Sequence, residues 1–394
     1  MGYDFYEFER EEYKNRLNKI KAVMFEKNLD AVVLTEEENI RWISGYWVFT
    51  MQDRCMPTVV IIPYSDKREP ILLTAGESTG EELSWIKKVK YWEEGSVPYL
   101  AADKGKVLVD TLKELDLKNL KVGMEIGNGM RVNLDLKDID YLRKSMDNVM
   151  FIDISNNLWE LRSIKSNAEI EKLKKASKIT NNSLKEGFKI LREGITERQL
   201  GQYFVKQWFE NGATGIAHVG VSFGKNAIKY AHCDPKEYPL KKGEVVKVDI
   251  GCKFEGYRCD MYRMACVGKP DAKEAKVASI IKKANQAVIK NIREGAKCSD
   301  LYNIAHKIFT DYRLGYLLSP SAYIGHGIGL GIHELPYLYR NNNSMLKSGM
   351  VLTVEPWTLD RNDPSICMNV EDVVVVRENG YEVLTDMERD IYLV

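Results

Sequence analysis

The chain has 394 residues, which is long enough for two domains that each bury a hydrophobic core. Lysine plus arginine and aspartate plus glutamate both total 57, so the net charge is zero, which argues against nucleic acid or an anionic membrane surface as the main partner. Seven cysteines, an odd number without a Cys-x-x-Cys pair, indicate reduced thiols in a cytoplasmic protein, and the apolar runs are too short to span a bilayer.

The first 160 residues alternate between helix and strand patterns, which predicts an α/β domain over residues 1–160. An amphipathic helix near residues 11–27 leads into the apolar run 31–34. Further strands are expected at residues 58–63, 71–74, 106–109, 121–125 and 150–154. The domain contains no G-x-G-x-x-G or Walker A sequence, so the usual nucleotide fingerprints are absent from it.

A boundary is expected near residues 158–164, which assigns residues 161–394 to a second domain. Capping signals predict that four helices follow, beginning at Ser166, Thr196, Asp271 and either Ser299 or Asp300. Each half of this domain therefore has the pattern helix, helix, strand hairpin. The strands are expected inside and the helices outside.

The second domain also repeats three sequence blocks in the same order. Leu-Arg-Glu-Gly at 191–194 recurs as Ile-Arg-Glu-Gly at 292–295, and His-x-x-Pro recurs at 232–235 and 333–336. The third block, Leu-Lys-x-Gly-x-Val-x-x-Val followed by an acid, ends at Asp249 and again at Glu355. Such repetition indicates two related halves about a pseudo-twofold axis. Carboxylates and imidazoles that converge across this axis predict a metal site.

A hairpin in the first half carries two carboxylates. Glu255-Gly256 is expected to form its two-residue turn because glycine accepts positive φ. This turn places Asp249 opposite Tyr262 and puts Asp260 diagonal to Asp249 on the same face, roughly 7–8 Å away at Cα. That separation suits a pair of metal ions roughly 3.5–4 Å apart. The alternative, two solvated acids, is disfavoured because the flanking residues are apolar and unpaired buried carboxylates are costly.

The second half supplies two further carboxylates. Glu355 ends a strand expected over residues 350–354. Glu371 lies in the sequence Val-Glu-Asp, and the repeat makes it the counterpart of Asp260 with a longer connection. Both are therefore candidate metal ligands.

Three of the five histidines fall in the repeat or in its glycine-rich approach, which favours a functional role for them. His326 stands in Gly-His-Gly, where the backbone can approach a ligand closely. His232 and His333 begin the repeated His-x-x-Pro block. His218 and His306 are expected to be structural side chains.

As a set, the candidate ligands resemble the five metal ligands of the pita-bread metallopeptidases. The residues that carry this resemblance are Asp249, Asp260, His326, Glu355 and Glu371. The family includes methionine aminopeptidase, aminopeptidase P and prolidase, and creatinase shares the fold. The phrases Val-Asp-Ile-Gly, Gly-His-Gly-Ile-Gly-Leu and His-Glu-x-Pro are most similar to the prolidase and aminopeptidase P branch.

The resemblance implies an α/β (α+β) architecture. It consists of a creatinase-like N-terminal domain and a C-terminal pita-bread domain with an internal pseudo-twofold repeat. It also implies a homodimer in which the first domain covers the active site. The implied cofactor is two divalent metal ions per subunit, Mn²⁺ or Co²⁺ first and Zn²⁺ or Fe²⁺ as alternatives, since ligand type alone does not choose among them.

The implied roles divide the ligands between the two ions. Asp260 and Glu371 are expected to bridge the ions, Asp249 to bind one of them, and His326 and Glu355 to bind the other. Glu355 is also the candidate general base and proton shuttle.

Two histidines complete the expected catalytic set. His232 and His333 are expected to flank the substrate, one stabilising the oxyanion and the other orienting the scissile amide. The expected substrate is an Xaa-Pro dipeptide or short peptide. The alternatives are aminopeptidase P activity on longer peptides, hydrolysis of a small-molecule C–N amide as in ectoine hydrolase or creatinase, and a binding protein without activity.

Four residues near the expected site depart from the pattern of the family. They are Cys259 in place of serine, Tyr262 in place of threonine, Trp357 in place of a small residue and Asn369 in place of arginine. None of them removes a metal ligand. The departures therefore bear on the substrate more than on the metal.

Overall fold

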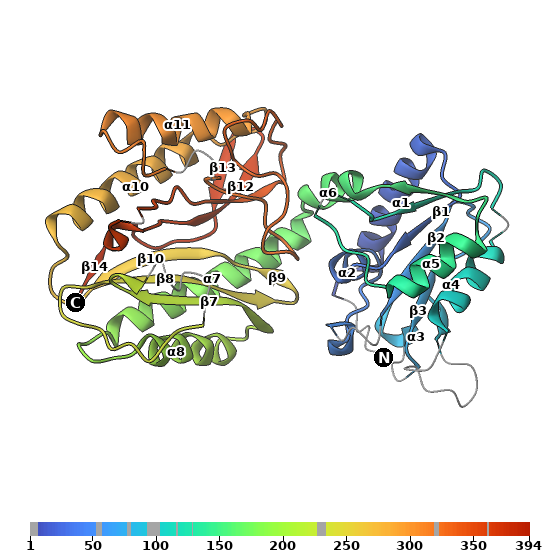
Figure 1. Ribbon diagram of the computed structural model, residues 1–394, viewed down its shortest axis with the longest axis horizontal. Coiled ribbons are helices and arrows are strands. Elements are labelled where there is room, and N and C mark those ends of the chain that lie inside the picture. Colours follow the sequence, from blue (N-terminus) through green and yellow to red (C-terminus); the bar gives the residue numbers. More distant parts are fainter. Residues whose placement is uncertain are drawn as a thin grey trace. The chain divides into compact units, whose positions relative to one another are not determined.

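Figure 1 shows the computed structural model of the chain. The residues that the structure describes are 7–52, 57–76, 80–92, 103–115, 117–127, 129–226, 234–318, 323–360 and 362–394. The chain divides into two units, Met1–Leu161 and Arg162–Val394. Across the described ranges, no helix combines the length and the apolar character that a membrane span requires.

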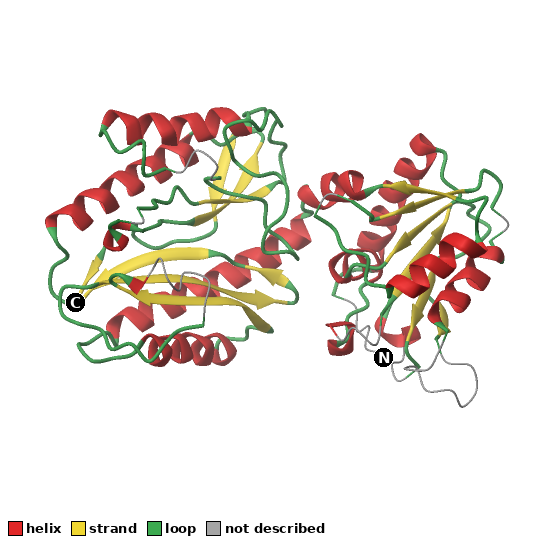
Figure 2. Ribbon diagram, viewed as in Figure 1, coloured by secondary structure: helices red, strands yellow, loops and turns green. Residues whose placement is uncertain are grey.

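The N-terminal unit is built around one six-stranded mixed sheet (Figure 2). Its elements are α1 (Arg10–Lys27), β1 (Ala31–Leu34), α2 (Glu37–Ser44), η1 (Phe49–Gln52), β2 (Val59–Pro63), β3 (Ile71–Thr74), α3 (Gly80–Leu83), β4 (Lys88–Tyr91), α4 (Lys104–Lys113), β5 (Lys121–Met124), α5 (Leu136–Ser145), β6 (Met150–Asp153) and α6 (Ser155–Ser163). The strand order is β4-β3-β2-β1-β5-β6, in which β1 pairs antiparallel with β2 and parallel with β5.

One of the strands expected in this unit is a helix. Residues 106–109 lie in α4, which Asp103 caps by accepting a hydrogen bond from the backbone N–H of Lys106. Leu108 and Leu112, four residues apart on one face of the helix, are buried against the sheet. A short apolar run fits either element, and here the helical spacing decides. The strands expected at the other positions are confirmed as β2, β3, β5 and β6.

The C-terminal unit places its strands between two pairs of helices, α7 with α8 and α10 with α11 (Figure 1). Its elements are α7 (Asn167–Lys189), α8 (Glu197–Glu210), β7 (Gly215–Phe223), β8 (Val245–Phe254), β9 (Tyr257–Arg258), β10 (Met261–Cys266), α10 (Ala272–Lys290), α11 (Cys298–Asp311), β11 (Val351–Val354), η3 (Pro364–Ile366), β12 (Asp372–Arg377), β13 (Gly380–Val383) and β14 (Tyr392–Leu393). One sheet has the order β14-β10-β8-β7, with β9 paired to β8, and the other has the order β11-β12-β13.

The two halves of this unit make equivalent backbone contacts. The N–H of Gly194 donates to the carbonyl of Leu240, and the N–H of Gly295 donates to that of Leu346, both at 2.8 Å. Gly194 and Gly295 also share a positive φ, 85° and 78°, which favours glycine at both turns. The sequence repeat is therefore a structural repeat.

The repeat extends to the caps of α7 and α10, which both begin with a capping box, but not to those of α8 and α11. Thr196 caps α8 with a complete capping box. The equivalent residue before α11 is Lys297, which makes no side-chain cap hydrogen bond. Ser299 and Asp300, the caps expected from the sequence, lie inside the first turn, because α11 begins at Cys298, two residues earlier than a cap at Ser299 requires and three earlier than a cap at Asp300 requires.

Replacing Thr196 by alanine is expected to lower the free energy of unfolding by about 1 kcal/mol, because α8 loses the acceptor for the backbone N–H of Gln199. The matched change Lys297→Ala removes no cap and is expected to change this free energy by less than about 0.5 kcal/mol. Urea unfolding followed by circular dichroism measures both variants. Equal decreases in the free energy of unfolding of the two variants would contradict the assignment of Thr196 as the cap of α8.

Candidate metal centre

The hairpin that carries two of the candidate ligands has the expected register. Glu255 and Gly256 form the turn, with φ values of 46° and 88°. Asp249 pairs with Tyr262 across β8 and β10, as the sequence predicts. Asp260 lies in the short break between β9 and β10.

The glycine-rich segment of the second half lies beside β11. The N–H of Thr353 donates to the carbonyl of His326 at 2.7 Å, and the N–H of Glu355 donates to that of Ile324 at 2.8 Å. A Cβ on Gly325 would lie 2.2 Å from the carbonyl oxygen of Thr353, so only glycine allows this approach. As a result, His326 Nε2 lies 3.2 Å from Glu355 Oε1.

The two halves meet at Asp260 and Glu371. The backbone N–H of Glu371 donates to the carbonyl of Tyr262 at 3.2 Å, which joins the second half to the first hairpin. Ligand atoms of Asp260, His326 and Glu371 all lie within 4.8 Å of one another. Asp260 belongs to a second such group with His218 and Asp249.

All five candidate ligands line one cavity of about 320 Å³. Asp249 and Asp260 reach it from the hairpin, and His326, Glu355 and Glu371 reach it from the second half. The structure therefore brings together residues that are up to 122 positions apart, counted from Asp249 to Glu371.

The electrostatics of this cavity suit a divalent cation. Burial raises the pKa of Glu371, and the carboxylates of Asp260 and Glu355 raise that pKa further, to well above its ordinary value. Oε1 of Glu371 is buried and has no hydrogen-bond partner among the described residues. A bound cation would satisfy this atom and offset the repulsion between the carboxylates. These residues therefore fit the pair of divalent metal ions that the family resemblance implies.

His326 has the orientation expected of a metal ligand. Its Nδ1 lies 2.9 Å from the carbonyl oxygen of Gly327, which can accept the ring proton. That hydrogen bond leaves Nε2 as the free nitrogen, facing Asp260 and Glu355. A histidine that binds metal through one nitrogen usually donates the other N–H in this way.

His333 lines the same cavity, and a buried ion cluster anchors the loop that carries it. The ring centroids of His333 and His326 are 4.4 Å apart. The next residue, Glu334, forms ion pairs with Arg162 and Lys165, and all three side chains are almost fully buried. Burial acts to raise the pKa of Glu334, but the two cations outweigh it and lower that pKa to about 2. No local sequence pattern indicates this role of Glu334, because its partners Arg162 and Lys165 lie far away in the chain.

The structure agrees with the prediction for only one of the other three histidines, and one of them lies outside the described residues. His232 lies outside the described residues, so its expected place beside the substrate stays a prediction. His306 lies in α11, as the helical pattern predicts. His218, expected to be structural, instead lines the metal cavity.

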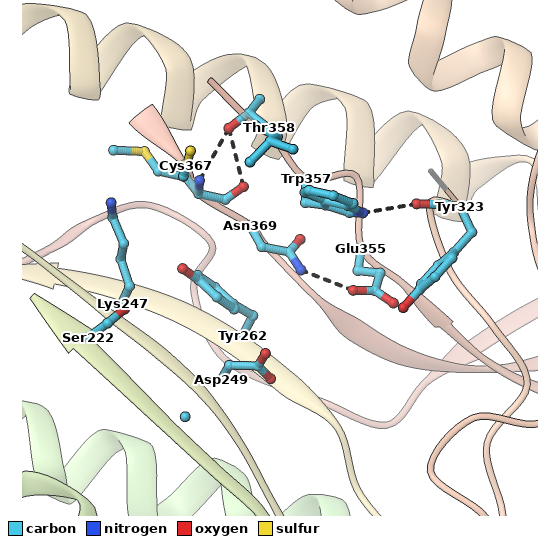
Figure 3. Close-up of a pocket in the computed structure, with 13 residues that line it drawn as sticks. Ser222, Lys247, Asp249, Tyr262, Tyr323, Glu355, Trp357, Thr358, Cys367 and Asn369 are labelled. Atoms are coloured by element: carbon cyan, nitrogen blue, oxygen red, sulfur yellow. Dashed lines mark hydrogen bonds between the residues drawn. The ribbon is translucent and has the colours of Figure 1, made fainter. Parts of the chain in front are cut away.

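A second cavity of about 160 Å³ (Figure 3) adjoins the first and shares four lining residues with it: Gly220, Asp249, Tyr323 and Glu355. Three of the four departures from the family pattern line this second cavity: Tyr262, Trp357 and Asn369. Nδ2 of Asn369 donates to Glu355 Oε2 at 3.2 Å, and Nε1 of Trp357 donates to the carbonyl of Tyr323 at 3.1 Å.

Lys247 also lines this second cavity, and its side chain is buried. Burial lowers the pKa of Lys247 to about 8. Its ammonium group donates to the carbonyls of Gly224 and Ser365, at 3.0 and 2.9 Å. The bond to Gly224 connects β8 to the end of β7, and the bond to Ser365 connects β8 to the segment that leads to Asn369.

Comparisons with known proteins agree with this geometry. Residues 171–378 match metallopeptidase family M24, and residues 16–164 match the creatinase/prolidase N-terminal domain. An uncharacterized peptidase of Staphylococcus saprophyticus is 30% identical over 381 residues, which cover 95% of this chain and 100% of the relative. The Xaa-Pro dipeptidase of Pyrococcus horikoshii is 25% identical over 380 residues, which cover 95% of this chain and 98% of that protein.

A solved structure extends the agreement to the fold of the chain. The prolidase from Thermococcus sibiricus aligns with a TM-score of 0.83 and 25% identity, over 97% of this chain and 99% of that one. These findings confirm the resemblance to the pita-bread metallopeptidases and the two-part α/β fold. The chain belongs to metallopeptidase family M24.

Proposed function

We propose that this peptidase is a metal-dependent hydrolase that cleaves the Xaa-Pro bond of dipeptides or short peptides. The observation that carries the proposal is the convergence of five carboxylate and imidazole ligands on one cavity, which His333 also lines. The Xaa-Pro dipeptidase of Pyrococcus horikoshii, which aligns along nearly all of the chain, supports the choice of substrate.

The proposed cofactor is two divalent ions, with Mn²⁺ or Co²⁺ as the first choice. The residues that would hold them are Asp249, Asp260, His326, Glu355 and Glu371. Bound ions of this kind would supply Lewis acidity, which would polarise an amide carbonyl and lower the pKa of water enough to provide a hydroxide nucleophile at neutral pH.

The side chains around the ligands would handle protons and orientation. Glu355 would accept a proton from the attacking water and pass it to the leaving nitrogen. Any amide nitrogen needs this proton to leave as an amine. A prolyl bond further requires a site that accepts a tertiary amide, because the proline nitrogen carries no hydrogen. Nδ2 of Asn369 donates a hydrogen bond to Oε2 of Glu355 and so orients that carboxylate. His333 and Tyr323, which contact each other, would orient the scissile amide.

The test is hydrolysis by metal-stripped enzyme reloaded with Mn²⁺ or Co²⁺. Ala-Pro, Leu-Pro, Gly-Pro-Ala and ectoine serve as substrates, and Leu-Ala serves as a control without proline. Metal-dependent cleavage of Ala-Pro and Leu-Pro, but not of Leu-Ala, is the expected result. Cleavage of Gly-Pro-Ala in preference to the dipeptides would assign aminopeptidase P activity. An enzyme that binds two metals and cuts none of the proline peptides would refute the proposal.

The second candidate is hydrolysis of a small-molecule C–N amide. The observation that favours it is the small cavity beside Glu355, because three departures from the family pattern meet there. Its volume of about 160 Å³ is close to that of a cavity that binds benzene, so it suits one compact group. Cleavage of ectoine without cleavage of the proline peptides would establish this alternative.

A further inference from the structure

An irregularity in β7 turns His218 toward the metal cavity. Ile216 pairs with Cys252 of β8, but His218, two residues later, pairs with Gly251, so the register shifts by one residue between them. Such a bulge reverses the alternation of side chains beyond it. Gly220, two residues after His218, pairs with Asp249, so His218 shares the face of the sheet that carries Asp249.

Gly251 leaves room for the imidazole on this face. A Cβ added at Gly251 would lie 3.2 Å from Cε1 of His218, a tight contact. The same Cβ would lie 1.7 Å from the carbonyl oxygen of Cys259, so the strand cannot accept a side chain there. The ring of His218 therefore lies over bare backbone, directly beside the carboxylate of Asp249.

Asp260 lies between two imidazoles. Nε2 of His218 is 3.2 Å from Oδ1 of Asp260 and 2.9 Å from Oδ1 of Asp249. Nε2 of His326 is 3.8 Å from the other oxygen of Asp260, Oδ2. Nε2 of His218 therefore faces one oxygen of the Asp260 carboxylate, and Nε2 of His326, an expected metal ligand, faces the other oxygen.

We propose that His218 is a sixth metal ligand, which binds the ion held by Asp249 and Asp260. Each of the two ions then has one imidazole, instead of a single imidazole for the pair. The inference concerns the metal centre alone and holds for either substrate class considered above. Because imidazole suits Co²⁺ and Zn²⁺ better than Mn²⁺, His218 should raise the preference of this ion site for Co²⁺ over Mn²⁺.

The test replaces His218 by phenylalanine, which keeps a planar ring of similar size but offers no ligand atom. His306→Phe is the matched control, since His306 lies in α11 and does not line the cavity. X-ray absorption of the Co²⁺-loaded proteins counts imidazoles per cobalt, and calorimetry of the metal-free proteins measures the affinity of each ion.

We expect the wild type and His306→Phe to show one imidazole per cobalt. His218→Phe should show one imidazole for every two cobalts and bind one of its two Co²⁺ ions at least about tenfold more weakly, with a smaller loss for Mn²⁺. An unchanged imidazole count in His218→Phe, or unchanged affinity for both ions, would overturn the proposal. If circular dichroism shows that His218→Phe does not fold, His218→Gln is judged by the same count. Neither readout involves substrate, so failure to cleave proline peptides leaves this test intact.

Discussion

Replacement of Asp260 by alanine is expected to abolish turnover, with a loss in kcat/KM of at least about 1000-fold, or about 4 kcal/mol of transition-state stabilisation. Asp260 is the residue common to both groups of ligand atoms, one with His218 and Asp249 and one with His326 and Glu371. Burial acts to raise the pKa of Asp260, but the neighbouring imidazoles outweigh it and lower that pKa, which favours the charged form that a metal requires. Its loss therefore weakens both ion sites together.

Metal content and hydrolysis of Ala-Pro check this prediction in the same samples. Mass spectrometry of the metals should find two ions per chain in the wild type and at most one in Asp260→Ala. Asp234→Ala is the matched control for metal content, because Asp234 lines the cavity but belongs to neither ligand group. An Asp260→Ala protein that keeps two ions and normal kcat/KM would show that the shared carboxylate is dispensable.

Replacement of Glu334 by alanine is expected to lower the free energy of unfolding by about 3–5 kcal/mol. The change leaves the guanidinium of Arg162 and the ammonium of Lys165 buried without the carboxylate that both contact. It also removes the acceptor for the backbone N–H of Gly331, at 2.9 Å. The exposed pair of Glu186 with Lys189 is the matched control, and Glu186→Ala should cost less than about 1 kcal/mol.

The stabilisation by Glu334 should also depend on pH. Its pKa in the folded protein is about 2, below the ordinary value of 4.5. A carboxyl group with a lowered pKa stabilises the fold above its unfolded-state pKa and loses this contribution as the pH falls toward the folded-state value. The difference between wild type and Glu334→Ala should therefore be full above about pH 5 and shrink by about 3 kcal/mol toward pH 2. Urea unfolding of both proteins at pH 7, 5 and 3 measures this difference in the free energy of unfolding. A difference that does not change with pH would contradict the stabilisation by the ionised Glu334 carboxylate.

Parts of the fold and the site could be predicted because local chemistry determines them. The turn at Glu255-Gly256 sets the register of its hairpin, so the pairing of Asp249 with Tyr262 follows from sequence counting. The repeated blocks likewise predict two related halves, and Gly194 and Gly295 adopt the same positive φ in those halves.

Other features depend on contacts that the sequence does not display. The bulge that turns His218 into the cavity involves residues 216–218, which carry no glycine or proline to mark it. Glu334 meets Lys165, 169 positions earlier in the chain, and no local pattern predicts that pair. Residues 106–109 fit a strand by composition, and the burial of Leu108 and Leu112 on one face against the sheet, together with the Asp103 cap, selects the helix.

The division of the centre between the two halves has a mechanical consequence. Asp249 and Asp260 belong to the first half, whereas His326, Glu355 and Glu371 belong to the second. An ion bound by both sets acts as a cross-link between segments that the intervening helices α10 and α11 separate along the chain. Ions present at 100 times their dissociation constant would add about 2.7 kcal/mol to the resistance of this unit to unfolding. A bound metal pair would therefore also hold the two halves together, and chelation is expected to lower the resistance of the whole C-terminal unit to unfolding.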